Sequence, residues 1–437
     1  MSNPLLEVIA ANRAGTCIAM PSICSAQPDV ILASALLAAE KGQTLLLEAT
    51  SNQVNQDGGY TGMKPADFVG YVKGICAKAG LSETALILGG DHLGPQVWRS
   101  MPADQAMAKA KELMKAYVQA GFTKIHLDCS EGCAGEDAQV GDDLSAGRAA
   151  ELAAVCEEYA PDASKLNYIV GTEVPPPGGA REEDEGHGIE PTPPARASAT
   201  LQMHFEKFDE LGLQAAKARI CGLVVQPGVE FSPFHIDHLP AGDGKALRAA
   251  LDPFKNVVFE AHSTDYQFDS TFPRLATMGF AIQKVGPALT FAYRQAIYAL
   301  DQVLDWLEGE SRTSPKISQV LEAEMLAEPK YWRSHYQGSG QELRLLRHFS
   351  YADRVRYYWP QEKVQSALTA VFASLANHTI PETLLLQLFA SQVVDRARAL
   401  QRHGFGIEKA LVLAQIQLAL EPYYFERVEA PQLEEAL

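Results

Sequence analysis

The sequence is short of basic residues relative to acidic ones and lacks long apolar runs. It contains 37 Lys and Arg against 54 Asp and Glu, which gives a formal net charge of −17. This balance argues against nucleic acid and anionic membranes as general partners, because both need a basic face. No run of about 18 apolar residues occurs, so we expect no membrane-spanning helix. The first residues show no basic stretch followed by an apolar one, so we expect no signal peptide.

Cofactor and disulfide motifs are also missing. No G-x-G-x-x-G turn follows the first apolar run and no P-loop occurs, so nothing local supports an NAD- or ATP-dependent reaction. The seven cysteines are odd in number and scattered, which is typical of a reduced, cytoplasmic protein. Cys129 and Cys133 lie close together, but no second Cys/His pair follows at zinc-finger spacing. We therefore expect no structural zinc.

What is present is a regular alternation of short apolar runs with longer amphipathic stretches. Each run is short and ends in polar, Gly or Pro residues, which is typical of buried parallel strands. Eight strand–helix units predict an α/β protein with a (β/α)₈ TIM barrel. An open doubly wound sheet is the alternative, but it would show fewer strands and a Gly-rich first turn. The eight runs are 16–24, 44–50, 85–92, 124–130, 167–174, 220–228, 256–264 and 280–287.

Two further regions differ from the alternating part. We assign residues 1–311 to the barrel and residues 312–437, which are helical in pattern with aromatic clusters, to an appended C-terminal helical subdomain. Residues 180–198 are acidic and rich in Pro and Gly, and they follow the fifth predicted strand. They are expected to form a loop on the C-terminal face of the barrel, either a lid or a solvated insertion.

Polar residues end seven of the eight predicted strands, where barrel enzymes place their catalytic groups. Glu260 and His262 are two residues apart and share a strand face, as do His126 and Asp128. Any one of them could be a satisfied polar group of the core, but buried carboxylates and imidazoles are costly unless they are paired or bind metal. The whole set therefore indicates a functional site: Glu48, Asp91, His92, His126, Asp128, Glu173, Gln226, Glu260, His262 and Lys284.

This set of side chains suits a divalent metal ion such as Zn²⁺ or Mn²⁺ with open coordination positions. Such an ion also makes a cluster of carboxylates tolerable and lets an anionic sugar approach it. Phosphate often binds at the ends of the last two strands of a barrel, and Gly286 follows Lys284 at that point. The residues alone thus predict a metal-dependent lyase, isomerase or epimerase acting on a small, phosphorylated carbohydrate.

Eight longer strings closely resemble one family, the Z-subunit family of D-tagatose-1,6-bisphosphate aldolase (GatZ/KbaZ), which also carries the label tagatose-6-phosphate kinase. The resemblance spans nearly the whole chain, and the family is similar to class II, metal-dependent ketose-bisphosphate aldolases. The strings are EATSNQVNQDGGYTGM (48–63), LGGDHLGP (88–95), KIHLDCSEGCAG (124–135), GTEVPPPGG (171–179), VVQPGVEF (224–231), EAHSTDYQ (260–267), KVGPALTFAYR (284–294) and RVRYYWP (354–360).

The resemblance implies roles for individual residues. Asp91 and His92 match the Asp-His pair of the aldolases, in which the His binds metal and the Asp acts as acid and base on the C4 hydroxyl. Asp128 matches the Asp of their Asp-Ala/Gly-Ser strand, and His262 resembles a metal-binding histidine. The aldolases have a further His where this chain has Glu173, which implies a His92, Glu173 and His262 metal site.

The substrate contacts follow from the same resemblance and from position. The Gly-rich phosphate loop of the aldolases is absent, because Ser263 and the residues after it stand there. Arg354 and Arg356 either reach a substrate phosphate or dock the C-terminal extension, and we favour docking. The expected substrate- and phosphate-binding residues are Glu48, Asn52, Gln226, Ser263, Lys284 and Gly286.

Two functions of different classes remain open. The first is a 4-epimerase that interconverts D-tagatose 6-phosphate and D-fructose 6-phosphate by a retro-aldol route, with Asp91 as one acid/base group and Glu173, Glu260 or Asp128 as the other. The second is a non-catalytic subunit that stabilises a separate aldolase catalytic subunit. The retained buried charges favour the enzyme, because an abandoned site would lose them. We expect a homo-oligomer in either case.

Overall fold

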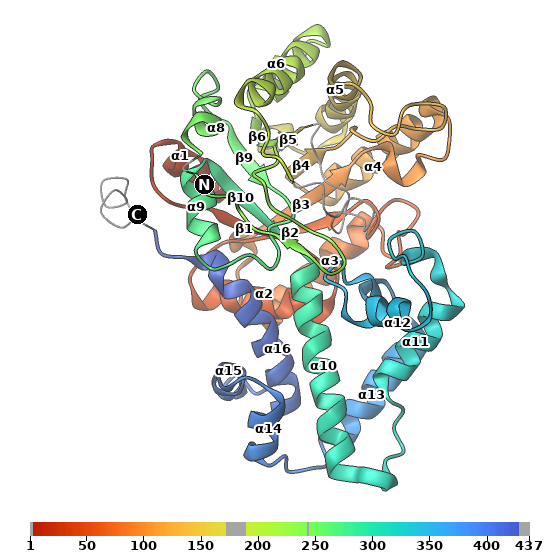
Figure 1. Ribbon diagram of the computed structural model, residues 1–437. Helices are drawn as coiled ribbons and strands as arrows, with labels where there is room; N and C mark the ends of the chain where they lie inside the picture. The colour runs from red at the N-terminus through yellow and green to blue at the C-terminus, as the bar shows by residue number, and fades with distance from the viewer. Residues whose placement is uncertain (1–2, 172–188, 243, 428–437) are drawn as a thin grey trace.

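The computed structural model describes residues 3–171, 189–242 and 244–427. Eight parallel strands close into a barrel in the order β1-β10-β9-β6-β5-β4-β3-β2, which confirms the predicted TIM barrel (Figure 1). Every barrel strand overlaps one of the predicted apolar runs. The strands are β1 (Met20–Cys24), β2 (Leu45–Thr50), β3 (Leu86–Leu93), β4 (Lys124–Leu127), β5 (Asn167–Val170), β6 (Ile220–Val224), β9 (Val258–Ala261) and β10 (Phe280–Val285).

Several helices of the barrel begin at a proline, a residue that favours the first turn of a helix. Pro occupies the first turn of α2, α3 and α10, a position where its missing N–H is not needed. The helices are α1 (Pro4–Arg13), α2 (Pro28–Glu40), α3 (Pro65–Lys78), α4 (Ala103–Ala120), α5 (Asp142–Tyr159), α6 (Pro194–Glu210), α7 (Gln214–Lys217), α8 (Lys245–Ala249), α9 (Thr271–Thr277) and α10 (Pro287–Glu308). Within the described ranges, no helix is both long and apolar enough to cross a membrane.

Two local features differ from the sequence prediction. Residues 194–198, expected in an irregular loop, form the first turn of α6, because Pro194 is well placed at a helix start. Residues 180–188 of that predicted loop lie outside the described residues. A short antiparallel pair, β7 (Glu230–Phe231) and β8 (Ile236–Asp237), follows β6 and was not predicted.

The strand register decides which residues lie beside the two buried glutamates of the barrel. Glu48 on β2 pairs with Gly89 on β3 and with Cys24 on β1, and Glu260 on β9 pairs with Val224 on β6. A Cβ atom at position 89 would lie only 2.7 Å from Oε1 of Glu48. Glycine at this position therefore leaves the space that the Glu48 carboxylate occupies inside the barrel.

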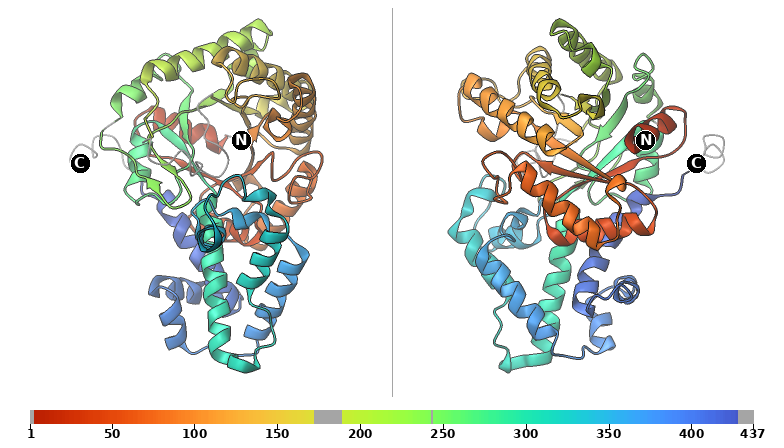
Figure 2. Two further views of the ribbon diagram at one scale, coloured as in Figure 1. Left: turned by 45° about the vertical axis from the view of Figure 1, so that its right-hand side comes forward. Right: turned by 180° about the vertical axis from the view of Figure 1, so that it is seen from behind.

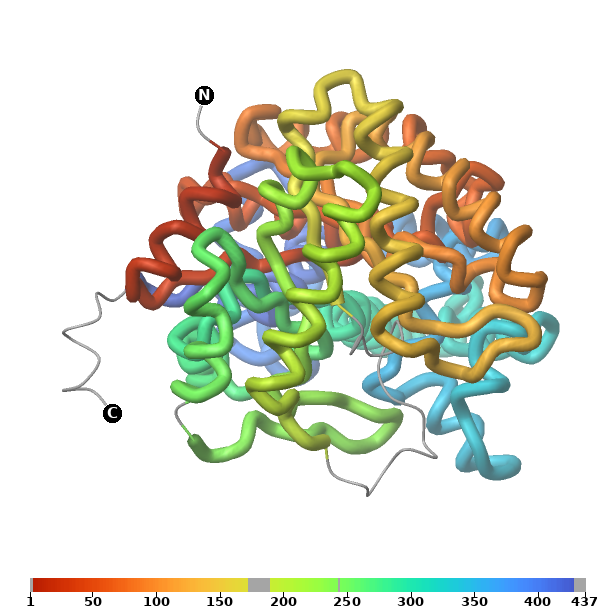
Figure 3. The backbone as a smooth tube through the Cα atoms, turned by 90° about the horizontal axis from the view of Figure 1, so that it is seen from above, coloured from red at the N-terminus to blue at the C-terminus, as the bar shows by residue number. Residues whose placement is uncertain are grey.

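The C-terminal helices form an appended helical part around the far half of α10 (Figure 2). Helix α16 packs against α2 and α10, and seen from above the cyan and blue segments lie beneath the barrel (Figure 3). This confirms the predicted helical extension, whose boundary at residues 311–312 stays a prediction. Its helices are α11 (Ile317–Ala327), α12 (Gly340–Phe349), α13 (Glu362–Leu375), α14 (Glu382–Leu388), α15 (Ser391–Gln401) and α16 (Ile407–Leu420).

Candidate functional site

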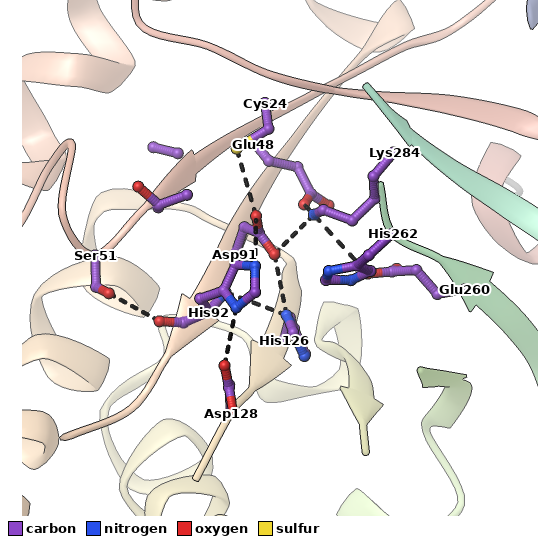
Figure 4. A network of polar contacts seen from close by, with 12 residues as sticks. Cys24, Glu48, Ser51, Asp91, His92, His126, Asp128, Glu260, His262 and Lys284 are labelled. Carbon is purple, nitrogen blue, oxygen red and sulfur yellow. Dashed lines mark hydrogen bonds and ion pairs between the residues drawn. The ribbon is translucent and has the colours of Figure 1, made fainter. Parts of the chain in front are cut away.

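Two buried lysines hold three carboxylates together inside the barrel. Lys124 forms ion pairs with Glu48 and, at 2.7 Å, with Oε2 of Glu260. Lys284 forms ion pairs with Glu48 and, at 2.7 Å, with Oδ1 of Asp91, and its Nζ lies 3.8 Å from Oε1 of Glu260. Figure 4 shows Lys284 between these acidic side chains. The interior of the barrel thus contains a layer of opposite charges beside an apolar cluster that includes Leu46, Ile169 and Ile282.

The pKa directions of four of these groups, Lys124, Lys284, Asp91 and Glu260, favour their ionised forms. Burial by itself would lower the pKa of Lys124, but the attraction of Glu260 and Glu48 outweighs it, so the pKa is raised. The same balance places the pKa of Lys284 well above its usual value. For Asp91 and Glu260, burial is outweighed by nearby positive groups, and their pKa values fall well below the usual range. Each buried charge is therefore compensated by an opposite one.

Three imidazoles from β3, β4 and the end of β9 face one another at the mouth of this layer. The ring centroids of His92, His126 and His262 are 5.1–5.2 Å apart in every pair. Nδ1 of His92 lies 2.9 Å from Oδ2 of Asp128, Nδ1 of His126 lies 3.0 Å from Oδ1 of Asp91, and Nε2 of His262 lies 3.0 Å from a carboxylate oxygen of Glu260. A carboxylate oxygen thus lies close to a ring nitrogen of each histidine, and the backbone N–H of His92 also donates to Nδ1 of His126 (Figure 4).

The protonation of two of these rings differs because their surroundings differ. Burial lowers the pKa of His262 to about 3, so its imidazole is neutral and keeps a lone pair for a metal ion. Burial also opposes protonation of His92, but Asp91 and Asp128 outweigh it and raise its pKa. The imidazole of His92 therefore keeps its second proton at a higher pH than that of His262 does.

The backbone is strained at two points of the site. His92 and Ser263 have φ values of 47° and 52°, in the left-handed region that residues with a side chain rarely adopt. Such strain persists where the surrounding structure fixes the residue, and it gathers at functional sites.

The residues present fit a divalent metal ion. One ligand atom each from Asp91, His126, Glu260 and His262 can be chosen so that all four lie within 4.8 Å of one another, and all four residues are buried. Two imidazole nitrogens and two carboxylate oxygens suit Zn²⁺ or Mn²⁺. Nε2 of His126 is buried and has no hydrogen-bond partner among the described residues, while its Nδ1 accepts the backbone N–H of His92 at 3.1 Å.

This cluster overlaps only partly with the metal site that the resemblance implies. It contains His262, together with Asp91 and Glu260, which were predicted as catalytic residues. His92 is not part of the four-residue group and turns Nδ1 to Asp128 instead. Glu173 lies outside the described residues. His126 was recognised only as a polar residue of a strand end.

A pocket of about 320 Å³ opens above the cluster. Asp91, His92, His262 and Lys284 line it at the barrel end. It extends past the starts of α2 and α10 to the segment between α12 and α13, which contributes Arg356, Tyr357 and Trp359. The C-terminal extension thus forms part of the wall.

The predicted substrate-binding residues fall into two groups. Lys284, Ser263 and Gly286 line the pocket. The other three are not among the residues that line it. Glu48 is wholly buried in the ion pairs, the backbone carbonyl of Asn52 accepts the backbone N–H of Tyr60, and the side-chain carbonyl of Gln226 accepts the N–H groups of Gly228 and Val229.

Asp265 occupies the start of α10, where many barrels bind phosphate. Its Oδ1 accepts the backbone N–H of Gly286 at 3.0 Å and that of Ala288 at 2.8 Å. Burial raises the pKa of this carboxyl to about 6, against the opposing effect of these two hydrogen bonds. The amide of Gly286 is thus already used within the chain.

The sequence prediction missed several residues of the site. Lys124 carries the clearest signal, because Lys124, His126 and Asp128 alternate along one strand and therefore share a face. Cys24 lines the pocket and lies 3.4 Å from Oδ2 of Asp91. Tyr60 lines the pocket from a loop and carried no recognisable pattern.

A family model and solved structures match the chain over most of its length. The model described as "D-tagatose-1,6-bisphosphate aldolase subunit GatZ/KbaZ-like" matches residues 5–427. A structure of a "probable tagatose 6 phosphate kinase" from Sinorhizobium meliloti 1021 is 44% identical, with a TM-score of 0.83, and the match covers 93% of this chain and 99% of that one.

Two more distant matches are both named as aldolases. The fructose-bisphosphate aldolase of Campylobacter jejuni is 12% identical with a TM-score of 0.45, and the match covers 88% of this chain and 93% of that one. The YdjI aldolase of Escherichia coli K12 is 13% identical with a TM-score of 0.42, and the match covers 72% of this chain and 89% of that one.

Proposed function

The chain belongs to the GatZ/KbaZ-like family of D-tagatose-1,6-bisphosphate aldolase subunits, and on that premise we propose that it is a metal-dependent ketose-phosphate 4-epimerase. Its substrates are D-tagatose 6-phosphate and D-fructose 6-phosphate, which differ only in configuration at C4. The observation that carries this proposal is the layer of ionised, buried side chains that opens into the pocket.

A layer of buried charges contributes little net stability compared with apolar residues of similar volume. Replacing a buried ion pair by apolar residues of similar volume is often neutral or stabilising by about 1–4 kcal/mol. A chain that only supported another subunit could replace Glu48, Lys124 and Glu260, which are all fully buried, together by apolar residues without losing stability. Their retention beneath an accessible pocket favours a catalytic role.

The proposed reaction breaks and re-forms the C3–C4 bond. A base removes the proton of the C4 hydroxyl, the electrons of the C3–C4 bond pass to the C2 carbonyl, and a three-carbon enediolate and glyceraldehyde 3-phosphate result. The aldehyde turns its other face to the enediolate, and the bond re-forms with C4 inverted. Direct removal of the C4 hydrogen is disfavoured, because that hydrogen is not α to the C2 carbonyl.

The residues of the pocket suit these steps. Asp91 is ionised and lines the pocket, so it can accept the proton of the C4 hydroxyl. His92, held by Asp128 and with its pKa raised, is suited to exchange a proton with the same oxygen after the aldehyde has turned. The ammonium of Lys284 lies beside Asp91 and stabilises negative charge that develops nearby.

A metal ion would be held by Asp91, His126, Glu260 and His262. When bound, it supplies Lewis-acid polarisation of the substrate carbonyl.

The direct test is to incubate the purified chain alone with D-tagatose 6-phosphate and Mn²⁺ or Zn²⁺ and to measure D-fructose 6-phosphate. We expect turnover that falls by more than about 100-fold in His262→Ala, because loss of an outer-shell partner alone costs 10–100-fold. His235→Ala is the control, since His235 is exposed and lies outside the pocket. Absence of turnover in the wild-type chain would refute the proposal.

The route can be tested in the same reaction run in D₂O. The retro-aldol route keeps the original hydrogen on C4, so no deuterium enters that position. Deuterium at C4 of the product would refute this mechanism and support direct proton removal.

A second candidate function, a stabilising subunit of a separate aldolase, is favoured by one observation. The carboxylates of Asp91 and Glu260 already have ammonium partners in Lys284 and Lys124. A site balanced by lysines can persist without metal. Co-purification with an aldolase catalytic subunit and an increase in that subunit's activity, without turnover by the chain alone, would support this alternative.

A further inference from the structure

The ordinary anion sites of the barrel are filled by the chain itself. Two helices that begin at the pocket, α2 and α10, have N-terminal amides of the kind that bind phosphate. At α10 the carboxylate of Asp265 accepts two of these amides. At α2 the side chain of Gln27 accepts the amides of Asp29 and Val30 at 2.6 and 2.8 Å. A phosphate at α10 would also meet the buried carboxyl group of Asp265.

The cations of the pocket differ in availability. Within the part of the chain that the structure describes, two side chains of Lys or Arg line the pocket, Lys284 and Arg356. Lys284 has three carboxylate partners. Arg356 donates to the backbone carbonyls of Ala352 and Asp353 and, at 3.2 Å, to the hydroxyl of Tyr357. No carboxylate of a described residue is within ion-pair distance of it.

A second guanidinium strengthens the positive charge at this end of the pocket. Arg354 is 6% exposed, and its guanidinium lies 4.5 Å from the ring centroid of Tyr357, on which Arg356 also packs at 4.7 Å. Nε of Arg354 donates to the carbonyl of Tyr331 rather than to a carboxylate. The nearby carboxylate of Asp353 accepts from Arg294 instead. Asp353 and Asp265 act on Arg356 at longer range, but neither guanidinium has a carboxylate of a described residue at ion-pair distance.

Tyr357, which lies beside both arginines, responds to that charge. Burial would raise the pKa of Tyr357, but Arg354 and Arg356 outweigh it and lower the pKa below its usual value. The ring of Tyr60, on the barrel side, lies 4.6 Å from the ring of Tyr357. Tyr60 and Tyr357 both line the pocket. They connect the arginine end of the pocket to the barrel end.

We propose that Arg356, supplied by the C-terminal extension, binds the phosphate group of the sugar phosphate, while the carbon chain lies toward Asp91 and His262. This rests on the proposed function for the choice of a sugar phosphate. An arginine fork matches phosphate oxygens and donates charge-assisted hydrogen bonds. The pocket volume of about 320 Å³ lies within the range of small-molecule sites, about 300–1,000 Å³. The barrel alone would therefore be an incomplete site.

Binding of D-fructose 6-phosphate and of D-fructose, measured by calorimetry with and without Mn²⁺, tests the proposal. This readout is the affinity and does not require that the chain turn the sugar over. We expect Arg356→Gln to weaken binding of D-fructose 6-phosphate by at least about tenfold and to leave binding of D-fructose unchanged. Arg333→Gln is the matched control, because Arg333 is an exposed arginine of the same extension outside the pocket. Equal affinity of Arg356→Gln and wild type for D-fructose 6-phosphate would overturn the proposal.

A second variant keeps the test decisive if Arg356→Gln does not fold. Gln365 is exposed, lines the same end of the pocket and donates to the backbone carbonyl of Trp359 at 2.7 Å. Gln365→Glu adds a negative charge there and removes this hydrogen bond, whereas Gln365→Leu removes the hydrogen bond alone. Gln365→Glu should therefore weaken binding of D-fructose 6-phosphate relative to Gln365→Leu. Equal affinity of these two variants would count against the phosphate site.

The outcomes separate this proposal from the proposed function. Phosphate-dependent binding that requires Arg356, without epimerase turnover, would support the phosphate site and refute the epimerase. Epimerase turnover with unchanged affinity in Arg356→Gln would support the epimerase and overturn the phosphate site. A wild-type chain that binds D-fructose 6-phosphate no better than D-fructose would also overturn it.

Discussion

Lys124→Met tests the view that the interior of the barrel is a balanced layer of charges. Lys124 is fully buried and forms ion pairs with two carboxylates, those of Glu48 and Glu260. Methionine has a similar volume and no charge, so the substitution removes the ammonium without opening a large cavity. Lys284 then remains as the one lysine described in contact with Glu48, Asp91 and Glu260.

The expected cost follows from that imbalance. Removing one partner of a buried ion pair costs about 3–5 kcal/mol, because the remaining charge is uncompensated in a medium of low polarity. We therefore expect the free energy of unfolding to fall by about that amount. The variant Lys124→Met with Glu48→Gln should recover part of the loss, since one of the two carboxylates is then neutral, and the coupling should lie within about 0.5–3 kcal/mol.

The pH dependence adds an independent check. The pKa of Lys124 is raised in the folded chain. The stabilisation that Lys124 gives is therefore complete at any pH below the pKa that the same lysine has in the unfolded chain. It is lost only as the pH rises from that value through the pKa of Lys124 in the folded chain. The difference between wild type and Lys124→Met should therefore be constant between about pH 6 and pH 9.

Urea denaturation followed by circular dichroism measures these free energies. Lys363→Met is the control, because Lys363 forms an ion pair with Glu324 at 2.7 Å but is exposed, so its loss should cost less than about 1 kcal/mol. A cost for Lys124→Met no larger than that of Lys363→Met would refute the charge-layer reasoning. So would a double variant less stable than Lys124→Met alone.

Three further predictions concern metal, pH and thiol chemistry. His126→Ala and His262→Ala should each weaken Mn²⁺ or Zn²⁺ binding in equilibrium dialysis by at least about tenfold, and unchanged binding in both would remove the four-residue cluster as the metal site. Burial raises the pKa of Glu230 to about 7, so this carboxyl is protonated in the folded chain at a pH where it is ionised in the unfolded chain. The free energy of unfolding of wild type relative to Glu230→Gln should therefore fall by about 3 kcal/mol as the pH rises from 4.5 to 7. A difference between the two that does not change with pH would contradict this. Burial, followed by the charge of Asp91, raises the pKa of Cys24 well above 9.0, so mass spectrometry should find its thiol largely unmodified by iodoacetamide at about pH 8, although it lines the pocket.

The fold could be predicted because its signals are local. Each barrel strand is a short apolar run, and runs such as 44–50 and 280–287 need no knowledge of distant residues to be recognised. Boundaries were less well defined, since the run 16–24 begins four residues before β1 at Met20. The first turn of α6 was missed because the Pro-rich composition around Pro194 is equally typical of a loop.

The site could be predicted as a set of residues but not as a geometry. The alternation of Glu260 with His262 placed both on one face of a strand, and the structure holds them 3.0 Å apart. Which histidines share a ligand cluster depends on how three different strands, β3, β4 and β9, are registered around the barrel. His126 therefore joins His262 in the cluster, while the backbone conformation of His92 turns its ring to Asp128.

The sequence by itself determined the barrel, the polar ends of its strands and the excess of acidic residues, because periodicity, composition and order along the chain are local properties. Only the tertiary structure decided how those charges are balanced, since the closed barrel brings Lys124 and Lys284 to the same carboxylates from strands far apart in the sequence. It also decided that Asp265 fills the start of α10 and that Arg356, from the extension, completes the pocket. These contacts join segments whose separation in the sequence says nothing about their distance in space, and only packing fixes that distance.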